Sequence, residues 1–209
     1  MSHYSVIARV SQELRRILWQ SFDQQNDIKQ YVKGLESIVF TNPTDANKNA
    51  NHKLSLWLYQ ITENEFVKNR PMVRQDTNGN GNVALSFPPL AVNLFYLITP
   101  FASFNDSAES QTADHLLLGR TMQTLYDNAI VHLHSTIAGE EISEELRIIF
   151  CRLTLEELTR IWEALQEPYR LSICYQVRVS RIDSQRSLFR PPVTDRIVDS
   201  QDTAVPATG

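Results

Sequence analysis

Apolar residues near the start of the chain recur every three or four positions, which is the spacing of one face of an α-helix. Charged side chains occupy many of the positions between them, so the pattern predicts an amphipathic helix with one buried side. The apolar positions of this first helix are Val6, Ile7, Val10, Leu14, Ile17 and Leu18.

Two shorter apolar segments follow, and both predict strands. Residues 37–41 (SIVFT) end just before an Asn-Pro pair, which is typical of a turn. Residues 54–62 (LSLWLYQIT) carry few polar side chains at either odd or even positions, so we expect a strand that is covered on both faces. The polar stretches that follow each of these segments are expected to be connections.

The most apolar stretch of the chain is residues 87–101 (FPPLAVNLFYLITPF). It is shorter than the roughly 20 residues that a membrane-spanning helix needs, and Asn93 would lack a hydrogen-bonding partner in lipid. Its prolines cannot donate ladder hydrogen bonds, but they can bring the chain to the start of a strand. We therefore expect residues 90–99 to be a buried central strand with both faces covered, including the face that carries Phe95 and Leu97.

The second half of the chain predicts a long helix and then two strands with a short helix between them. The strands are expected at residues 146–153 and 171–183, where apolar and strand-forming residues gather. The short helix follows Thr154, which forms a capping box with Glu157. The long helix is expected from the spacing of Ala113, Leu116, Leu117, Met122, Leu125 and Ile130.

This order of elements predicts an α+β protein. We expect a single domain over residues 1–183, in which amphipathic helices pack on a mixed central β-sheet. Residues 184–209 contain prolines and show no period, so we expect an extended C-terminal tail.

The composition is that of a soluble globular protein, with 42% hydrophobic and 21% charged residues. The formal net charge of −4 argues against a nucleic-acid-binding protein, which usually has a basic face. The first residues show no apolar run before a cleavage site, so no secretory signal is expected. Cys151 and Cys174 lie far apart in the sequence, and we expect two buried thiols rather than a disulfide or a metal pair.

Asp76 to Gly81 matches the first half of a calcium-binding loop. Such a loop needs a carboxylate at its twelfth position, and Phe87 stands there instead. Asn-Gly pairs are strong turn signals by themselves, so a turn without bound calcium is expected.

Histidines and paired acids give no catalytic constellation. His132 and His134 are expected near the end of a helix, where they would contact carbonyl groups. The adjacent acids Glu140-Glu141, Glu144-Glu145 and Glu156-Glu157 are expected on helices or at their starts, where they face solvent. No catalytic, metal-binding or cofactor-binding residue is therefore assigned.

Four segments in combination resemble the cap, or tail-terminator, proteins of extracellular contractile injection systems. These phage-tail-like particles include the Photorhabdus virulence cassettes and the antifeeding prophage. The resemblance extends from the first helix to about Pro192. The segments that carry it are LWLYQITENEFVKNRP (56–71), PPLAVNLFYLITPF (88–101), LLLGRTMQTLYDNAIV (116–131) and LTLEELTRIWEALQEPYRLSICYQVRVSRID (153–183).

The resemblance implies a tail-terminator-like fold and a structural role without enzymatic activity. Such a protein forms a ring, expected to be a homohexamer, that ends the inner tube and the sheath far from the baseplate. Its implied partners are further copies of itself, the sheath protein and the inner tube protein, with no nucleic acid and no membrane insertion. It would be made in the bacterial cytoplasm and become part of a phage tail-like particle, whether released or retained. Some relatives carry a further domain, and the roles of that domain are not carried over.

Two other functions stay open. One is an adaptor that links the tail end to a membrane or to cargo, although no basic amphipathic anchor is present. The other is a metal-dependent hydrolase with a site around His115, His132 and His134.

The tail mixes apolar and basic side chains, which favours an interaction arm. An extended arm can add a strand to an exposed sheet edge of a neighbouring cap subunit or of the sheath. The candidate interface residues are Arg186, Leu188, Phe189, Arg190, Val193, Arg196 and Ile197.

Overall fold

The computed structural model describes residues 4–67, 71–77, 82–102, 108–137, 140–182, 184 and 186–190. The chain forms two compact units. The larger comprises residues 1–70 and 89–183, and the smaller comprises residues 71–88 and 184–209. Residues 71–86, which are expected to be a connection, are thus grouped, together with Phe87 and Pro88, with the segment that follows residue 183.

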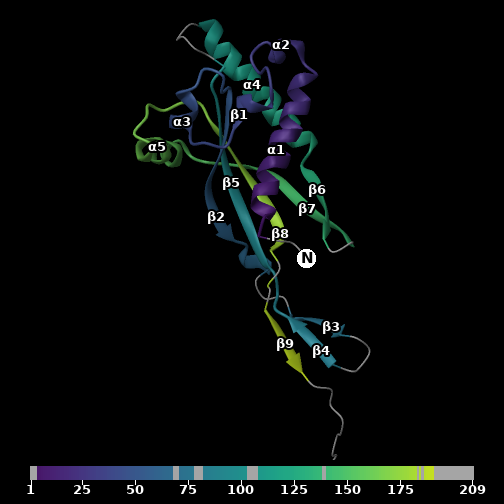
Figure 1. Ribbon diagram of the computed structural model, residues 1–209. Helices are drawn as coiled ribbons and strands as arrows, with labels where there is room; N and C mark the ends of the chain where they lie inside the picture. Colours follow the sequence, from purple (N-terminus) through teal and green to yellow (C-terminus); the bar gives the residue numbers. More distant parts are fainter. Residues whose placement is uncertain are drawn as a thin grey trace, which may run out of the picture. The chain divides into compact units, whose positions relative to one another are not determined.

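The larger unit is built on a six-stranded sheet (Figure 1). Its strand order is β1-β2-β5-β8-β7-β6, and only β1 runs parallel to its neighbour. The predicted α+β class with a mixed central sheet is therefore confirmed. The strands are β1 (Ile38–Val39), β2 (Leu54–Glu63), β5 (Leu90–Pro100), β6 (Ile130–Ile137), β7 (Glu140–Cys151) and β8 (Ile173–Ile182).

Strand β5 is central, as its apolar sequence predicts, and it pairs with β2 and β8 along most of its length. Leu94 and Tyr96 are fully buried on one face of the sheet. On the other face, Leu97 is fully buried but Phe95 is only half-buried. Both faces of β5 are thus covered, as expected, fully at Leu97 and in part at Phe95.

Helices α1 (Val6–Asp23) and α4 (Ala108–Asp127) pack together and supply the core on the first face (Figure 1). The predicted apolar stripe of α1 is buried there, and Phe22 joins it. Two hydroxyl pairs join elements distant in sequence. Those of Ser11 and Tyr96 lie 2.8 Å apart, and those of Ser21 and Thr124 lie 2.6 Å apart. The core is therefore mostly apolar, with polar groups paired at its border.

The long predicted helix ends earlier than its sequence pattern suggests, and a strand follows it. Strand β6 starts at Ile130, and its buried Val131 and Leu133 alternate with exposed His132 and His134. The partner strand β7 begins at Glu140 rather than near residue 146. Among the residues of β6 whose burial is described, two are buried, and this short alternation is a weak local signal. The pairing with β7 therefore decides the conformation of β6.

Several short helices lie between the larger elements. Asn42 caps α3 (Pro43–Asn47), since its side chain accepts a hydrogen bond from the Asp45 amide and proline suits the first helical turn. The others are α2 (Asn26–Lys29) and the 3₁₀ turns η1 (Leu35–Ser37) and η2 (Glu65–Val67).

The smaller unit contains a three-stranded antiparallel sheet. Strand β4 (Asn82–Ser86) lies between β3 (Val73–Thr77) and β9 (Ser187–Arg190). The amide of Phe87 also donates to the carbonyl of Arg186, with 3.3 Å between nitrogen and oxygen. The first residues of the expected tail thus pair with a hairpin of their own chain.

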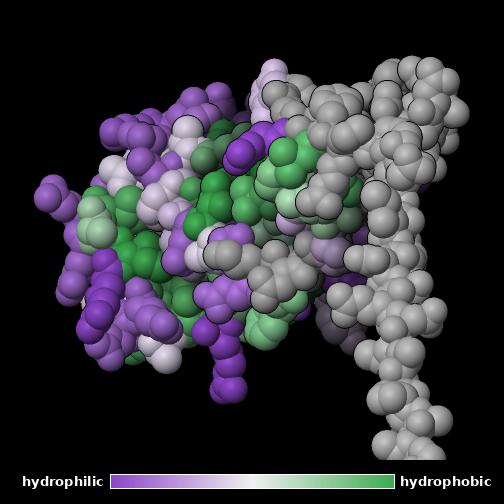
Figure 2. Space-filling model, turned by 90° about the horizontal axis from the view of Figure 1, so that it is seen from below, coloured by the Kyte–Doolittle hydropathy of each residue, from purple (hydrophilic) through white to green (hydrophobic). Residues whose placement is uncertain are grey.

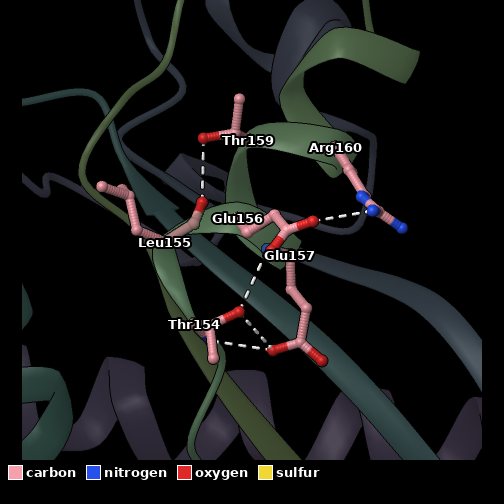
Figure 3. Close-up of polar contacts among 6 residues, drawn as sticks. All are labelled: Thr154, Leu155, Glu156, Glu157, Thr159 and Arg160. Atoms are coloured by element: carbon pink, nitrogen blue, oxygen red, sulfur yellow. Dashed lines mark hydrogen bonds and ion pairs between the residues drawn. The ribbon is translucent and has the colours of Figure 1, made fainter.

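Helix α5 (Leu155–Ala164) begins with the predicted capping box (Figure 3). The Thr154 hydroxyl accepts a hydrogen bond from the Glu157 amide at 3.2 Å, and the Glu157 carboxylate accepts one from the Thr154 amide at 2.8 Å. The Glu157 carboxylate also accepts a hydrogen bond from the Thr154 hydroxyl at 2.9 Å. The bonds that the Thr154 amide and hydroxyl donate to this carboxylate hold the pKa of Glu157 below its usual range. Trp162 then anchors the helix, because it is buried and its indole donates to the Ser172 hydroxyl at 3.3 Å.

Leu97 and Phe95 of β5 differ in burial, so replacing each with alanine should lower the free energy of unfolding by different amounts. Leu97→Ala should lower the free energy of unfolding by about 2–5 kcal/mol, because a fully buried side chain leaves a cavity. Phe95→Ala should cost clearly less, because its ring is already partly in water. Urea unfolding of both variants checks this, and equal losses would contradict the described burial.

Loss of the capping box should destabilise α5. Thr154→Ala should lower the free energy of unfolding by about 1 kcal/mol, because one amide of the first turn loses its acceptor. Thr159→Ala is a matched control, since that hydroxyl only donates to the Leu155 carbonyl within the same helix. Denaturant unfolding measures both variants, and equal effects would contradict the prediction.

The contribution of the capping box should also depend on pH. Folding lowers the pKa of Glu157, so the ionised carboxylate stabilises the folded chain. This contribution to the free energy of unfolding is fully present above the unfolded pKa and is lost as the pH falls through the folded pKa. The difference in stability between the native chain and Thr154→Ala should therefore shrink as the pH falls below the unfolded pKa of the glutamate. A constant difference down to pH 2 would contradict this role of the carboxylate.

Candidate interaction surfaces

The predicted interface residues of the tail are described only in part. Leu188 is exposed on β9, and Phe189 and Arg190 belong to the same strand. The Arg186 guanidinium lies 4.8 Å from the centre of the Phe87 ring, in a cation–π contact within the smaller unit. Val193, Arg196 and Ile197 lie outside the described residues. The interface role of all seven residues stays a prediction.

His132 and His134 lie on a different element from the one expected. His132 and His134 share one side of strand β6, so the expectation of histidines at a helix end is wrong. His115 lies on α4, on a different element. Among the described residues, no group of three His, Cys, Asp or Glu side chains could hold a metal ion.

Two of the three acidic pairs also lie on a strand. Glu140-Glu141 and Glu144-Glu145 belong to β7, so the expectation that they lie on helices is wrong. The expected exposure to solvent is wrong at Glu144, which is buried. Glu156-Glu157 lies in the first turn of α5, as expected. Glu156 pairs there with Arg160 at 2.7 Å. An exposed pair of this kind adds little to stability.

The apparent calcium loop is part of the hairpin in the smaller unit. Asp76 lies in β3 and pairs with Val83 in β4. Residues 78–81, which would supply the turn and further ligands, lie outside the described residues. The expectation that this loop binds no calcium stays a prediction.

The two cysteines, distant in sequence, are directly opposite each other in the sheet. Cys151 ends β7 and pairs in register with Cys174 of β8. Both thiols are free, with Cys174 buried and Cys151 partly buried. The Cys174 sulfur lies 3.4 Å from the hydroxyl oxygen of Tyr59. Burial raises the pKa of the Cys174 thiol to about 12.

Helix α4 has an exposed face that carries large apolar side chains. At 100° per residue, Leu116, Met122 and Tyr126 lie on the same side of the helix as Gly119, which is near the centre of that side. Tyr126 is 81% exposed, and a Cβ atom added at Gly119 would meet nothing within 4 Å. Glycine destabilises a helix interior, yet a larger residue would fit at this position in the described chain.

A hollow adjoins this exposed face of α4. It has a volume of about 570 Å³ and lies between the region of α2 and the middle of α4. Ile28 and Asp27 line one side, and Leu116, Gly119 and Arg120 line the other. The exposed face of α4 is thus a ridge of apolar side chains beside a depression.

A second group of exposed apolar side chains lies around α5. Leu155 begins the helix, and Tyr169 and Leu171 follow it before β8. Figure 1 shows α5 and α4 well separated on the larger unit. Figure 2 shows hydrophobic residues reaching the surface between hydrophilic ones in the view from below. Large exposed apolar groups of this kind mark interaction surfaces when they are clustered.

The larger sheet leaves an edge beside α1. Strand β6 is the last strand of the sheet, and a groove of about 600 Å³ runs between it and α1. Glu13, Arg16 and His132 are among the polar residues that line this groove. The Arg9 guanidinium donates to the carbonyl of His134 at 2.7 Å, so one backbone acceptor of the edge already has a partner. None of the helices in the described chain is long and apolar enough to cross a membrane.

Comparison with solved structures shows the fold. The chain is similar to a cryo-EM structure of the PVC sheath/tube terminator of an extracellular contractile injection system, in the extended state. The TM-score is 0.54 at 20% sequence identity, and the alignment covers 90% of this chain and 63% of that chain. The present chain therefore spans less than two thirds of the length of the matched terminator, whose fold it shares.

A cryo-EM structure of the tube-terminating cap of the anti-feeding prophage is also similar. Its TM-score is 0.48 at 20% identity, with 69% of this chain and 48% of that chain covered. No curated protein matches the sequence. A protein-family model, described as the Pvc16 N-terminal domain, matches residues 9–196. Because this match spans most of the sequence, the chain belongs to the Pvc16 N-terminal domain family.

Proposed function

We propose that this protein is a structural cap, which forms a ring and ends the inner tube and the sheath of a contractile injection particle at the end distal to the baseplate. The observation that carries the proposal is the family match over residues 9–196. The shared fold with a sheath/tube terminator over 90% of the chain supports it. The partners are further copies of the chain, the sheath protein and the inner tube protein.

Ring formation requires two different surfaces on each subunit. A closed ring uses a heterologous interface, in which one patch of a subunit contacts a different patch of the next. The larger unit has two separate groups of exposed apolar side chains, one on α4 and one around α5. We assign these two groups to successive contacts around the ring, which we take to be a homohexamer.

The role is structural and involves no reaction. A terminator must match the last layer of tube and sheath on one side and offer nothing to a further layer on the other. Buried apolar side chains form the core of the described chain, and its exposed surfaces carry apolar and charged groups suited to partners. The particle is assembled in the bacterial cytoplasm.

The segment after β9 serves as an arm in this proposal. Strand β9 is already paired with β4, so the residues up to Arg190 belong to the smaller unit. Val193, Arg196 and Ile197 then provide apolar and basic groups for a neighbouring subunit or for the sheath. Main-chain pairing at an open sheet edge gives affinity in such contacts, and the side chains give register.

Particle length tests the proposed function. A strain that lacks this chain should produce particles of variable length, and the full chain supplied from a plasmid should restore a uniform length. A chain ending after Arg190 keeps β9 and should fold normally, yet it should restore uniform length poorly. Uniform particles in the strain that lacks the chain would overturn the capping role, whereas full rescue by the truncated chain would overturn only the arm.

The exposed glycine of α4 gives a test of the ring contact. Gly119→Ala should raise the free energy of unfolding of the isolated chain by about 1 kcal/mol, because alanine favours a helix and the position is open. Gly119→Trp should fold but should reduce ring formation, because the indole would hold the next copy away from α4. Thermal unfolding measures the first effect, and electron microscopy of assembled particles measures the second.

Gln12→Trp is the matched control, since Gln12 is an exposed position on α1 away from this face of α4. Rings should form normally with this variant. Normal rings with Gly119→Trp as well would exclude α4 from the contact between subunits.

A further inference from the structure

The two cysteines are placed so that a disulfide could form with only a small local movement. Cys151 and Cys174 are direct cross-strand partners in an antiparallel pair. The side chains of such partners lie on the same face of the sheet, with Cβ atoms about 4.5–5.5 Å apart. A disulfide needs Cβ atoms about 3.5–4.5 Å apart and Cα atoms within roughly 4.4–6.8 Å, so a small local approach suffices.

We propose that Cys151 and Cys174 are a redox-responsive pair that forms a cross-strand disulfide when the folded chain meets a low-molecular-weight disulfide oxidant such as oxidised glutathione. The inference does not depend on the proposed capping function. It concerns only the junction of β7 and β8, which lies within the larger unit.

The unequal burial of the two thiols sets the order of the steps. Cys151 is partly exposed, whereas Cys174 is 2% exposed, so an external oxidant reaches Cys151 first. Burial also raises the pKa of Cys174, which keeps that thiol protonated at neutral pH. The Cys151 thiolate attacks one sulfur of the oxidant, forms a mixed disulfide and releases one small thiolate.

The disulfide between the two cysteines forms in the second step. Cys174 loses its proton to solvent, and its sulfur attacks the Cys151 sulfur of the mixed disulfide. The bond between Cys151 and the small thiol breaks, and the second small thiolate leaves and takes up a proton. In total, the two protein thiols lose two hydrogens and one oxidant disulfide is reduced to two thiols.

Tyr59 is placed to assist the second step as a positioning residue. Its hydroxyl oxygen lies 3.4 Å from the Cys174 sulfur, close enough for a hydrogen bond to that atom. Burial raises the pKa of Tyr59, so the hydroxyl keeps its proton and can donate. A donated hydrogen bond stabilises the Cys174 thiolate as it forms, which favours closure of the disulfide.

Closure would fasten α5 to the sheet. The segment between the two cysteines contains the whole of α5 and the exposed Leu155, Tyr169 and Leu171. A disulfide restricts this segment in the unfolded chain and so raises stability. For a loop of this length and a chain of this size, the melting temperature should rise by about 10 °C.

Oxidation of the full, folded chain tests the proposal. The reduced chain is incubated with glutathione buffers of increasing oxidised fraction, free thiols are blocked, and peptides are analysed by mass spectrometry. We expect a Cys151–Cys174 disulfide with loss of two hydrogens, a higher melting temperature, and full reversal by dithiothreitol. A stable glutathione adduct on Cys151 in the native chain, or a disulfide between two chains, would overturn the proposal.

Single variants test the order of steps. Cys174→Ser should accumulate a glutathione adduct at Cys151, whereas Cys151→Ser should remain almost unmodified because Cys174 is buried. Tyr59→Phe should reach the same oxidised end state more slowly, with the rate of closure shifted to higher pH. Equal modification of the two serine variants would contradict the order of steps, and an unchanged pH profile in Tyr59→Phe would remove the positioning role.

Discussion

Burial of strand β5 is the constraint on which the rest of the larger unit depends. The strand supplies fully buried side chains to both faces of the sheet, and it pairs with β2 on one side and β8 on the other. Helices α1 and α4 cover one face, where their buried apolar side chains share one core cluster with those of β5. The apolar strand β5 thus contacts α1 and β2 from the start of the larger unit, α4 from its middle and β8 from its end.

The two faces of this sheet are used differently. The face under α1 and α4 forms a continuous core, where Tyr96 and Ser11 pair their hydroxyls at the border. The opposite face is covered around Leu97 but only in part around Phe95. Together with the exposed apolar groups on α4 and around α5, this incomplete cover suits a subunit whose surfaces are completed by neighbours. A chain that acted alone would gain stability by burying these groups itself.

The pairing of β7 with β8 determines how the two cysteines are placed and how they can react. The same register that buries Cys174 beside Tyr59 also places Cys151 directly opposite it. Burial keeps Cys174 unreactive until its partner has reacted, so the proposed oxidation follows from the arrangement of the strands rather than from an unusually reactive thiol. The region also carries α5, whose capping box and buried Trp162 hold it at the end of the sheet.

The sequence by itself determined the elements whose signals are local. The stripe of α1, the apolar run of β5 and the pair Thr154 and Glu157 each decide their conformation through neighbours in the chain. Only the tertiary structure decided strand β6, the pairing of β9 with the β3–β4 hairpin, and the meeting of Cys151 with Cys174. These features depend on contacts between residues far apart in the sequence. The same holds for Gly119, because only the structure shows that the space around this helical glycine is open.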